Sequence, residues 1–208
     1  MIILGLTGSV GMGKSVAAGM LRRLGVPVHD SDAAVHRALA PRGAAVATVA
    51  KAFPGTRGRD GGIDRAVLGG KVFGDVVALK RLERILHPLV RRSQARFLKL
   101  ARTRRERLVV LDIPLLFETG GDKRCDMVVV VSAPAWLQRQ RVMARPGMTE
   151  SRFRAVLAKQ MPDAEKRRRA DIVVPSGLGR AVTFRRLKRL VHSLHRRAAC
   201  TGDPALPD

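Results

Sequence analysis

The feature that most constrains this chain is a glycine-rich segment near its start, Gly8 to Ser15, which reads GSVGMGKS. It fits the pattern G-x-x-x-x-G-K-[ST], and it stands between the short apolar run Ile2 to Thr7 and the helical pattern Lys14 to Leu24. Glycines let successive backbone N–H groups turn inward, and the start of the next helix adds unpaired donors and the positive end of its dipole. We therefore expect a phosphate-binding loop and a bound nucleotide.

Two side chains of this loop, and one further along the chain, have expected roles at the phosphates. Lys14 is placed to reach the β- and γ-phosphates, and the Ser15 hydroxyl is placed to ligate Mg²⁺. Asp112, which follows the apolar run Leu108 to Leu111, is a second Mg²⁺ candidate. It could equally orient the loop at 114–118.

The rest of the chain alternates short apolar runs with helical patterns, which favours an α/β fold with a parallel sheet covered by helices on both faces. The expected strands are Ile2 to Thr7, Val26 to His29, Leu108 to Leu111, Met127 to Val131 and Ile172 to Val174. Gly25 is expected to end the first helix, and Arg180 to Arg197 is expected to form the last one.

The longest stretch without a strand pattern, residues 32–106, is expected to be a helical substrate-binding lobe. Its expected helices are Ala33 to Ala40, Gly43 to Phe53, Asp64 to Phe73, Val76 to Leu86 and a long one from Pro88 onward. Residues 1–31 and 107–197 then form the nucleotide-binding core. Residues 139–170 form a basic helical lid inserted in that core, and residues 198–208 form a flexible tail.

The composition limits the partners of the chain. A net charge of +23, with nine lysines and 31 arginines, would attract any polyanion, although coding bias towards arginine, with most of the charge on solvated faces, explains the bulk of it. Aromatic residues make up only 3%, so platforms for stacking nucleic-acid bases are scarce. No apolar run of about 18 residues is present, so no membrane span is expected. Neither a specific nucleic acid nor an obligate protein partner is indicated.

The two cysteines and the N-terminus indicate the compartment. Cys125 and Cys200 share no metal-ligand spacing, and both are expected to be reduced thiols. The first residues, MIILGLTG, have no basic segment before the apolar run, so they are expected to form a strand rather than a signal peptide. We expect a cytoplasmic protein.

The reaction class follows by elimination among nucleotide-binding proteins. The chain contains no asparagine, so it lacks the N-K-x-D element with which a GTPase reads guanine. At 208 residues it is short for a helicase or a large ATPase motor. A small ATP-dependent kinase remains.

Several polar residues are candidates for the acceptor end of such a site. Asp30 and Asp32 follow the second strand, where a carboxylate could accept a proton from an attacking hydroxyl or help to hold Mg²⁺; either could instead cap the next helix. His87 is a candidate for contact with the acceptor, although a histidine before Pro88 at a helix start is more often structural. Arg139, Arg141 and Arg145 lie where a lid would fold over the phosphates, and planar guanidinium groups suit a transferring phosphoryl group.

Taken together, these segments resemble the dephospho-coenzyme A kinase family over about residues 2–175. The matching pieces are LTGSVGMGKS (6–15), VHDSDAAVH (28–36), HPLV (87–90), LDIPLLFE (111–118), RQRVMARPGMT (139–149) and AEKRRRAD (164–171). The loop alone is shared by many enzymes. The ordered set, with D-x-D after the second strand and PLLFE after the third, is much more specific.

The resemblance implies a five-stranded parallel core, a helical substrate-binding domain and a lid. It also implies ATP and dephospho-coenzyme A as substrates, with Mg²⁺ as cofactor. Asp32 would activate the ribose 3′-hydroxyl of the acceptor, and Arg141 and Arg145 would be the lid arginines near the phosphates. The residues that would surround ATP are Gly8, Gly11, Met12, Gly13, Lys14, Ser15 and Val16.

The sequence departs from the family pattern at three positions, and two rival functions stay open. Ser9 and Met12 stand where the family often has glycine and serine, which removes no backbone donor, and Pro146 stands where many members have an acidic residue in the lid. One rival is another small-metabolite or nucleoside monophosphate kinase on the same scaffold. The other is a nucleic-acid-binding ATPase, which the charge would favour and the scarcity of aromatics disfavours.

Overall fold

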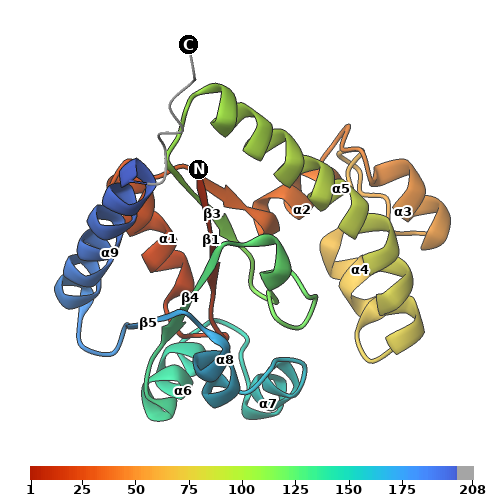
Figure 1. Ribbon diagram of the computed structural model, residues 1–208. Helices are drawn as coiled ribbons and strands as arrows, with labels where there is room; N and C mark the ends of the chain where they lie inside the picture. The colour runs from red at the N-terminus through yellow and green to blue at the C-terminus, as the bar shows by residue number, and fades with distance from the viewer. Residues whose placement is uncertain (201–208) are drawn as a thin grey trace. The chain divides into compact units, whose positions relative to one another are not determined.

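The computed structural model describes residues 1–200, with side chains up to Arg197 (Figure 1). The chain forms two compact units. One is built from residues 1–29 together with the chain from Leu100 onward, and the other from residues 30–99. The sequence placed these boundaries at 31/32 and 106/107, which is two and seven residues later.

The first unit contains a five-stranded sheet in the order β2-β3-β1-β4-β5. Parallel pairing of β1 with β3 and β4, and of β4 with β5, confirms the predicted parallel α/β core. Each strand begins or ends within two residues of the predicted run. The strands are β1 (Ile2–Thr7), β2 (Val28–Asp30), β3 (Leu108–Asp112), β4 (Met127–Ser132) and β5 (Ile172–Pro175).

Two helices, α1 (Lys14–Arg23) and α9 (Arg180–Cys200), pack together against one face of this sheet (Figure 1). Alternate strand residues face them, because successive side chains of a strand point to opposite faces. The resulting cluster is almost fully buried and includes Leu4, Leu6, Val110, Val129, Leu21 and Leu187. Gly25, at φ 80°, ends the turn after α1, as the sequence predicted.

The opposite face of β1 is covered by the chain that follows β3. A Cβ added at Gly5 would lie 2.8 Å from Cys125 Sγ and 2.9 Å from a Leu116 methyl group. Cys125 follows the short 3₁₀ helix η1 (Asp122–Arg124) and is a free, half-buried thiol, as predicted. The thiol of Cys200 lies outside the described side chains.

Cys125 is expected to react slowly with alkylating reagents while the protein is folded. Burial raises the pKa of its thiol from 9.0 to about 11, an effect that the neighbouring Arg124 only partly offsets, and the thiolate is the reactive form. In a Cys200→Ser background, iodoacetamide labelling at pH 8 should be slow and should accelerate towards pH 11, whereas the chain in urea should label quickly. The pKa of the thiol is higher in the folded than in the unfolded protein. The stability that the protonated thiol contributes is therefore fully present below about pH 9 and is lost as the pH rises through about 11. Fast labelling of folded protein at neutral pH would contradict this.

Three short helices follow β4 and lead to β5, and they correspond to the predicted lid region. They are α6 (Ala135–Met143), α7 (Glu150–Ala158) and α8 (Asp163–Arg169). Asp163 and Glu165 stand in the first turn of α8 and four basic residues in its last turns, an order that complements the helix dipole.

The second unit is a helical lobe with its own apolar core. Its helices are α2 (Ser31–Leu39), α3 (Val46–Ala52), α4 (Arg65–Val72) and α5 (Val76–Thr103), whose last residues belong to the first unit. The core cluster includes Leu39, Val49, Phe53, Leu68, Leu82 and Leu86. Apolar residues from all four helices thus meet in one cluster, which gives this unit a core independent of the sheet.

The prediction of two helices around Pro88 is wrong, because α5 runs through this proline without a break. Proline removes one helical N–H and crowds the preceding turn, which normally ends a helix. Here Leu82 and Leu86 before the proline, and Leu89 after it, all pack against the same core cluster. This shared burial keeps the two halves in one helix. His87 is consequently an exposed residue inside a helix and does not stand at a helix start.

No helix within the described part of the chain is both long and apolar enough to cross a membrane. The predicted flexible tail began at Ala198, but α9 continues to Cys200. The remainder of that tail, from residue 201, lies outside the described residues.

Candidate functional site

The loop between β1 and α1 has the backbone conformation that the glycine pattern predicts. Gly11 and Gly13 have φ angles of 77° and 89°, values that favour glycine. A Cβ at Gly11 would also lie 2.6 Å from a Val142 methyl group of α6. Gly13 is the N-cap of α1, so the N–H groups of the next residues have no partner in the helix ladder. These donors form the expected anion-binding end of the loop.

Lys14 and Asp112 form an ion pair at the carboxyl edge of the sheet. The register of β1 with β3 pairs Leu6 with Asp112, and Lys14 Nζ lies 2.7 Å from Asp112 Oδ1. Asp112 is 3% exposed, so the carboxylate is held in a desolvated position next to the phosphate-binding loop. The sequence presented Asp112 either as a metal ligand or as a residue that orients the next loop. The structure adds a direct contact with Lys14.

The backbone of Val10, on the outer side of the loop, is held by two glutamine side chains. Gln138 of α6 donates from Nε2 to the Val10 carbonyl (2.8 Å), and the Val10 N–H donates to Gln160 Oε1 (3.0 Å). Gln160 follows α7, so the segment predicted to be a lid contacts the phosphate-binding loop directly. The sequence interpretation missed both residues. The one indication in the sequence was that both glutamines follow the fourth strand, whose carboxyl end lies at the same edge of the sheet as the phosphate-binding loop.

Arg141 and Ser176 hold the next two carbonyls of the loop. The Ser176 hydroxyl donates to the Met12 carbonyl (2.6 Å), and Arg141 donates to the Ser176 hydroxyl (3.0 Å) and carbonyl (2.9 Å) and at 3.4 Å to the Gly11 carbonyl. Met12 itself is 2% exposed and accepts at its sulfur from the Ala133 N–H (3.1 Å). The guanidinium of Arg141 therefore braces the loop from its carbonyl side.

A buried ion pair joins α8 to the loop after β3. Lys166 of α8 is fully buried, and its Nζ lies 2.9 Å from Glu118 Oε1. The same carboxylate oxygen accepts from the Met161 N–H (2.8 Å). Residues 160 and 161 are thus held at the phosphate-binding loop and at the 114–118 loop respectively. Charged side chains are rarely buried unless they are paired, so the buried Lys166 requires Glu118 next to it and fixes where α8 meets the 114–118 loop.

Gln160→Ala is expected to weaken ATP use without unfolding the protein. The change leaves the Val10 N–H without its acceptor, and one such bond contributes about 0.5–1.5 kcal/mol, so KM for ATP should rise about two- to tenfold with a smaller change in kcat. Gln160→Glu keeps an acceptor and should restore KM. Gln140→Ala, an exposed residue of α6, is the control. Equal KM values for Gln160→Ala and the control would show that the contact does not matter.

The other two candidate arginines, Arg139 and Arg145, differ in their surroundings. Arg139 pairs with Glu150 at 2.9 Å, and its hydrogen bond is the main reason that the pKa of Glu150 is lowered; both groups are exposed. Arg145 is exposed just beyond α6, and its side chain makes no hydrogen bond or ion pair with any described residue. Of the three candidates, Arg145 is the one that remains available to a ligand.

In the helical lobe, the structure separates the two aspartates of VHDSD. Asp30 is the N-cap of α2, and its side chain accepts from the Ala33 N–H at 2.9 Å. Asp32 is exposed in the first turn of α2 and makes no side-chain hydrogen bond or ion pair with any described residue. The capping role that the sequence left open therefore belongs to Asp30. Asp32 is left with a carboxylate that the fold does not use.

The donor set around the loop fits a cation of the Mg²⁺ type. Ser15 supplies an exposed hydroxyl, and Asp112 supplies a carboxylate. Within the described part of the chain, no group of three or more His, Cys, Asp or Glu side chains could form a metal cage. Mg²⁺ normally uses one or two protein oxygens and takes its other ligands from substrate phosphates and water. Two oxygen donors beside a phosphate-binding loop match this coordination of Mg²⁺.

Comparisons with known proteins agree with one another. A family model described as dephospho-CoA kinase matches residues 2–178. The dephospho-CoA kinase of Paramagnetospirillum magneticum is 68% identical over 80% of this chain and 78% of its own length, and that of Rhodospirillum rubrum is 58% identical over 90% and 89%. The crystal structure of TT1252 from Thermus thermophilus superposes with a TM-score of 0.78 at 38% identity, over 92% of this chain and 96% of that one. This chain therefore belongs to the dephospho-CoA kinase family and is a phosphotransferase.

Proposed function

We propose that the protein transfers the γ-phosphate of ATP to the ribose 3′-hydroxyl of dephospho-coenzyme A in a Mg²⁺-dependent reaction, giving ADP and coenzyme A. The observation that carries the proposal is the braced loop at residues 8–16 with Lys14 and Asp112 paired beside it. A loop whose carbonyls are tied back presents its N–H groups to phosphates at little cost in reorganisation. The family membership of the chain supports the identity of the acceptor.

At the phosphate end, the N–H groups of the loop and of the first turn of α1 surround the ATP phosphates. The Lys14 ammonium moves from Asp112 towards the β- and γ-oxygens and stabilises the charge on the transferring phosphoryl group. Ser15 and Asp112 hold Mg²⁺, directly or through water. When bound, Mg²⁺ neutralises charge on the phosphate oxygens.

At the acceptor end, Asp32 accepts the proton of the 3′-hydroxyl or orients that hydroxyl for in-line attack. Its support is the D-x-D pattern together with the exposed, unpartnered carboxylate. Arg145 supplies a guanidinium group to the phosphates, while Arg141 holds the Gly11 carbonyl and Ser176 at the back of the loop. His87, exposed on α5, contacts the acceptor. Because ATP is plentiful in the cytoplasm, we place the reaction there.

The test is ADP release by purified protein across a panel of hydroxyl acceptors, with the product identified by mass spectrometry. Dephospho-coenzyme A should be turned over, nucleoside monophosphates should not, and EDTA should abolish turnover until Mg²⁺ is restored. Good turnover of nucleoside monophosphates with none of dephospho-coenzyme A would overturn the proposal. Single-stranded nucleic acid should not stimulate ATP hydrolysis, which separates this function from that of a nucleic-acid-dependent ATPase.

A further inference from the structure

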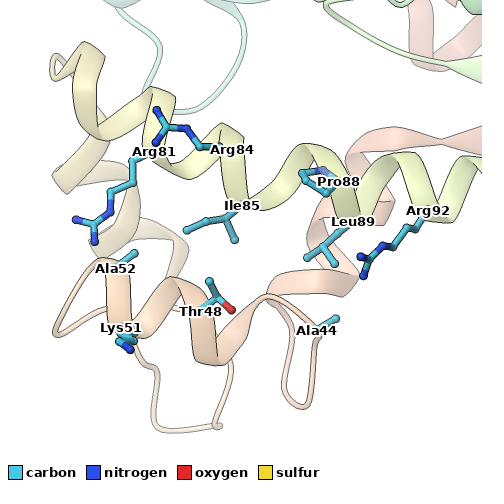
Figure 2. Close-up of a pocket in the computed structure, with 10 residues that line it drawn as sticks. All are labelled: Ala44, Thr48, Lys51, Ala52, Arg81, Arg84, Ile85, Pro88, Leu89 and Arg92. Atoms are coloured by element: carbon cyan, nitrogen blue, oxygen red, sulfur yellow. The ribbon is translucent and has the colours of Figure 1, made fainter.

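A pocket of about 650 Å³ lies within the helical lobe, between α3 and the first two-thirds of α5 (Figure 2). Its size is that of a site for a small organic molecule. All of its lining residues belong to the lobe. They are Ala44, Thr48, Lys51, Ala52, Arg81, Arg84, Ile85, Pro88, Leu89 and Arg92.

Cationic side chains surround this pocket without carboxylate partners. Lys51, Arg81, Arg84 and Arg92 form no ion pair with any described residue. In Figure 2, Arg81 and Arg92 reach down from α5 on either side of the hollow, whereas Arg84 points away from it. Arg81 is partly fixed, because its guanidinium lies 5.8 Å from the centre of the Phe53 ring.

Most of the few carboxylates of the lobe form hydrogen bonds away from this pocket. Residues 30–99 contain fourteen Lys and Arg but only six Asp and Glu. Four of the six acidic side chains accept hydrogen bonds from backbone N–H groups at turns or helix starts; they are Asp30, Asp60, Asp64 and Asp75. Asp32 stands in the first turn of α2, and Glu83 lies outside the pocket lining. The positive charge of the pocket is therefore not neutralised from within the lobe, and an anion from solution would be attracted.

The floor of the pocket is apolar. Figure 2 shows Ile85 and Leu89 of α5 facing Ala52 and Ala44 across the hollow, with the Thr48 hydroxyl between them. A single guanidinium group can donate two parallel hydrogen bonds to phosphate oxygens. An uncharged chain laid over the apolar floor would remove apolar surface from water, which is favourable. The combination suits a phosphate or diphosphate group attached to a short uncharged chain.

The pocket is on a different side of α5 from the residues proposed to act on the acceptor hydroxyl. Gln94 donates to the Ser31 hydroxyl at 3.2 Å, so the start of α2, where Asp32 stands, packs on the Gln94 side of α5. At about 100° per residue, His87 falls within about 20° of Gln94. Ile85 and Arg92 fall about 180° and 160° away. The pocket is thus separate from the His87 side of the helix.

We propose that this pocket is a second anion site, which binds the phosphate or diphosphate group of a small molecule and lays the adjoining uncharged chain over Ile85 and Leu89. Two sources offer this chemistry. One is the diphosphate and pantetheine arm of a coenzyme A compound bound apart from the reacting hydroxyl, an identification that rests on the proposed function. The other is an unrelated phosphate ester, an identification that is independent of the proposed function.

The test is direct binding of two probes, 4′-phosphopantetheine and inorganic pyrophosphate, to ¹⁵N-labelled full-length protein followed by NMR at about 0.15 M ionic strength. An ATP analogue and Mg²⁺ are present to occupy the phosphate-binding loop. Saturable shifts are expected at the backbone amides of Thr48, Lys51, Arg81 and Arg92. The double variant Arg81→Ala/Arg92→Ala should bind at least about tenfold more weakly.

The matched control removes the same charge from the same lobe outside the pocket. Arg65→Ala/Lys71→Ala, on exposed positions of α4, should keep wild-type affinity. Tighter binding of phosphopantetheine than of pyrophosphate, with displacement by coenzyme A, identifies the first source; equal binding of the two probes identifies the second. The proposal is overturned if neither probe binds saturably, or if both double variants lose affinity equally. Turnover of dephospho-coenzyme A by the wild type is measured separately, so failure of the pocket and failure of the proposed function remain distinguishable.

Discussion

Asp32→Asn is expected to lower turnover by about 10²–10⁴-fold while the melting temperature stays that of the wild type. Asparagine keeps the size of the side chain but cannot accept the proton of the acceptor hydroxyl. The stability of the fold should not change, because Asp32 is exposed and its side chain makes no hydrogen bond or ion pair with any described residue. KM for ATP should change little, since the loop at residues 8–16 is untouched.

Asp30 offers the control for this experiment, because it performs the structural task that Asp32 could have performed. Asp30→Ala removes the acceptor of the Ala33 N–H at 2.9 Å and should cost about 1 kcal/mol of stability, whereas Asp30→Asn should keep most of the cap. Turnover and melting temperature are measured for all three variants. Near-normal turnover in Asp32→Asn would remove Asp32 from the catalytic residues and leave Asp30 or Asp112 as the base.

Lys14→Met is expected to lower turnover by at least about 10²–10³-fold, the effect of removing one preorganised group that stabilises transition-state charge. Methionine keeps the aliphatic stem and loses only the ammonium group. Unlike Asp32→Asn, Lys14→Met should also lower the stability of the folded protein. The Asp112 side chain is 4% exposed and loses a partner at 2.7 Å, at a cost of about 1–3 kcal/mol.

A double variant separates the two consequences of the Lys14 change. In Lys14→Met/Asp112→Asn the buried charge is gone, so the melting temperature should recover while turnover stays low. Thermal unfolding and initial rates at saturating ATP are the measurements. Wild-type turnover in Lys14→Met would contradict the role of Lys14, and a melting temperature that the second change fails to raise would contradict the account of the ion pair.

The fold and the phosphate-binding loop were predictable because their causes are local in sequence. Gly13 takes its left-handed conformation, and Lys14 begins a helix, through backbone rules that act over a few residues. The five apolar runs became the strands of one sheet for a similar reason: the three central strands, β3, β1 and β4, are buried along most of their length, and β2 and β5 form the partly exposed edges. Family membership followed from the order of short motifs, and the comparisons confirm it.

Tertiary structure decided what depends on contacts between distant segments. Pro88 is unfavourable in a helix by local rules, yet α5 continues because leucines on both sides of it share one core. From the sequence, Asp30 and Asp32 are equally good candidates for the N-cap of α2, and only the backbone geometry shows that Asp30 is the cap. Gln160 holds Val10 across 150 positions of sequence, and Lys166 is buried against Glu118. No local pattern encodes such pairs, because they form only when the parallel sheet brings the ends of its strands to one edge.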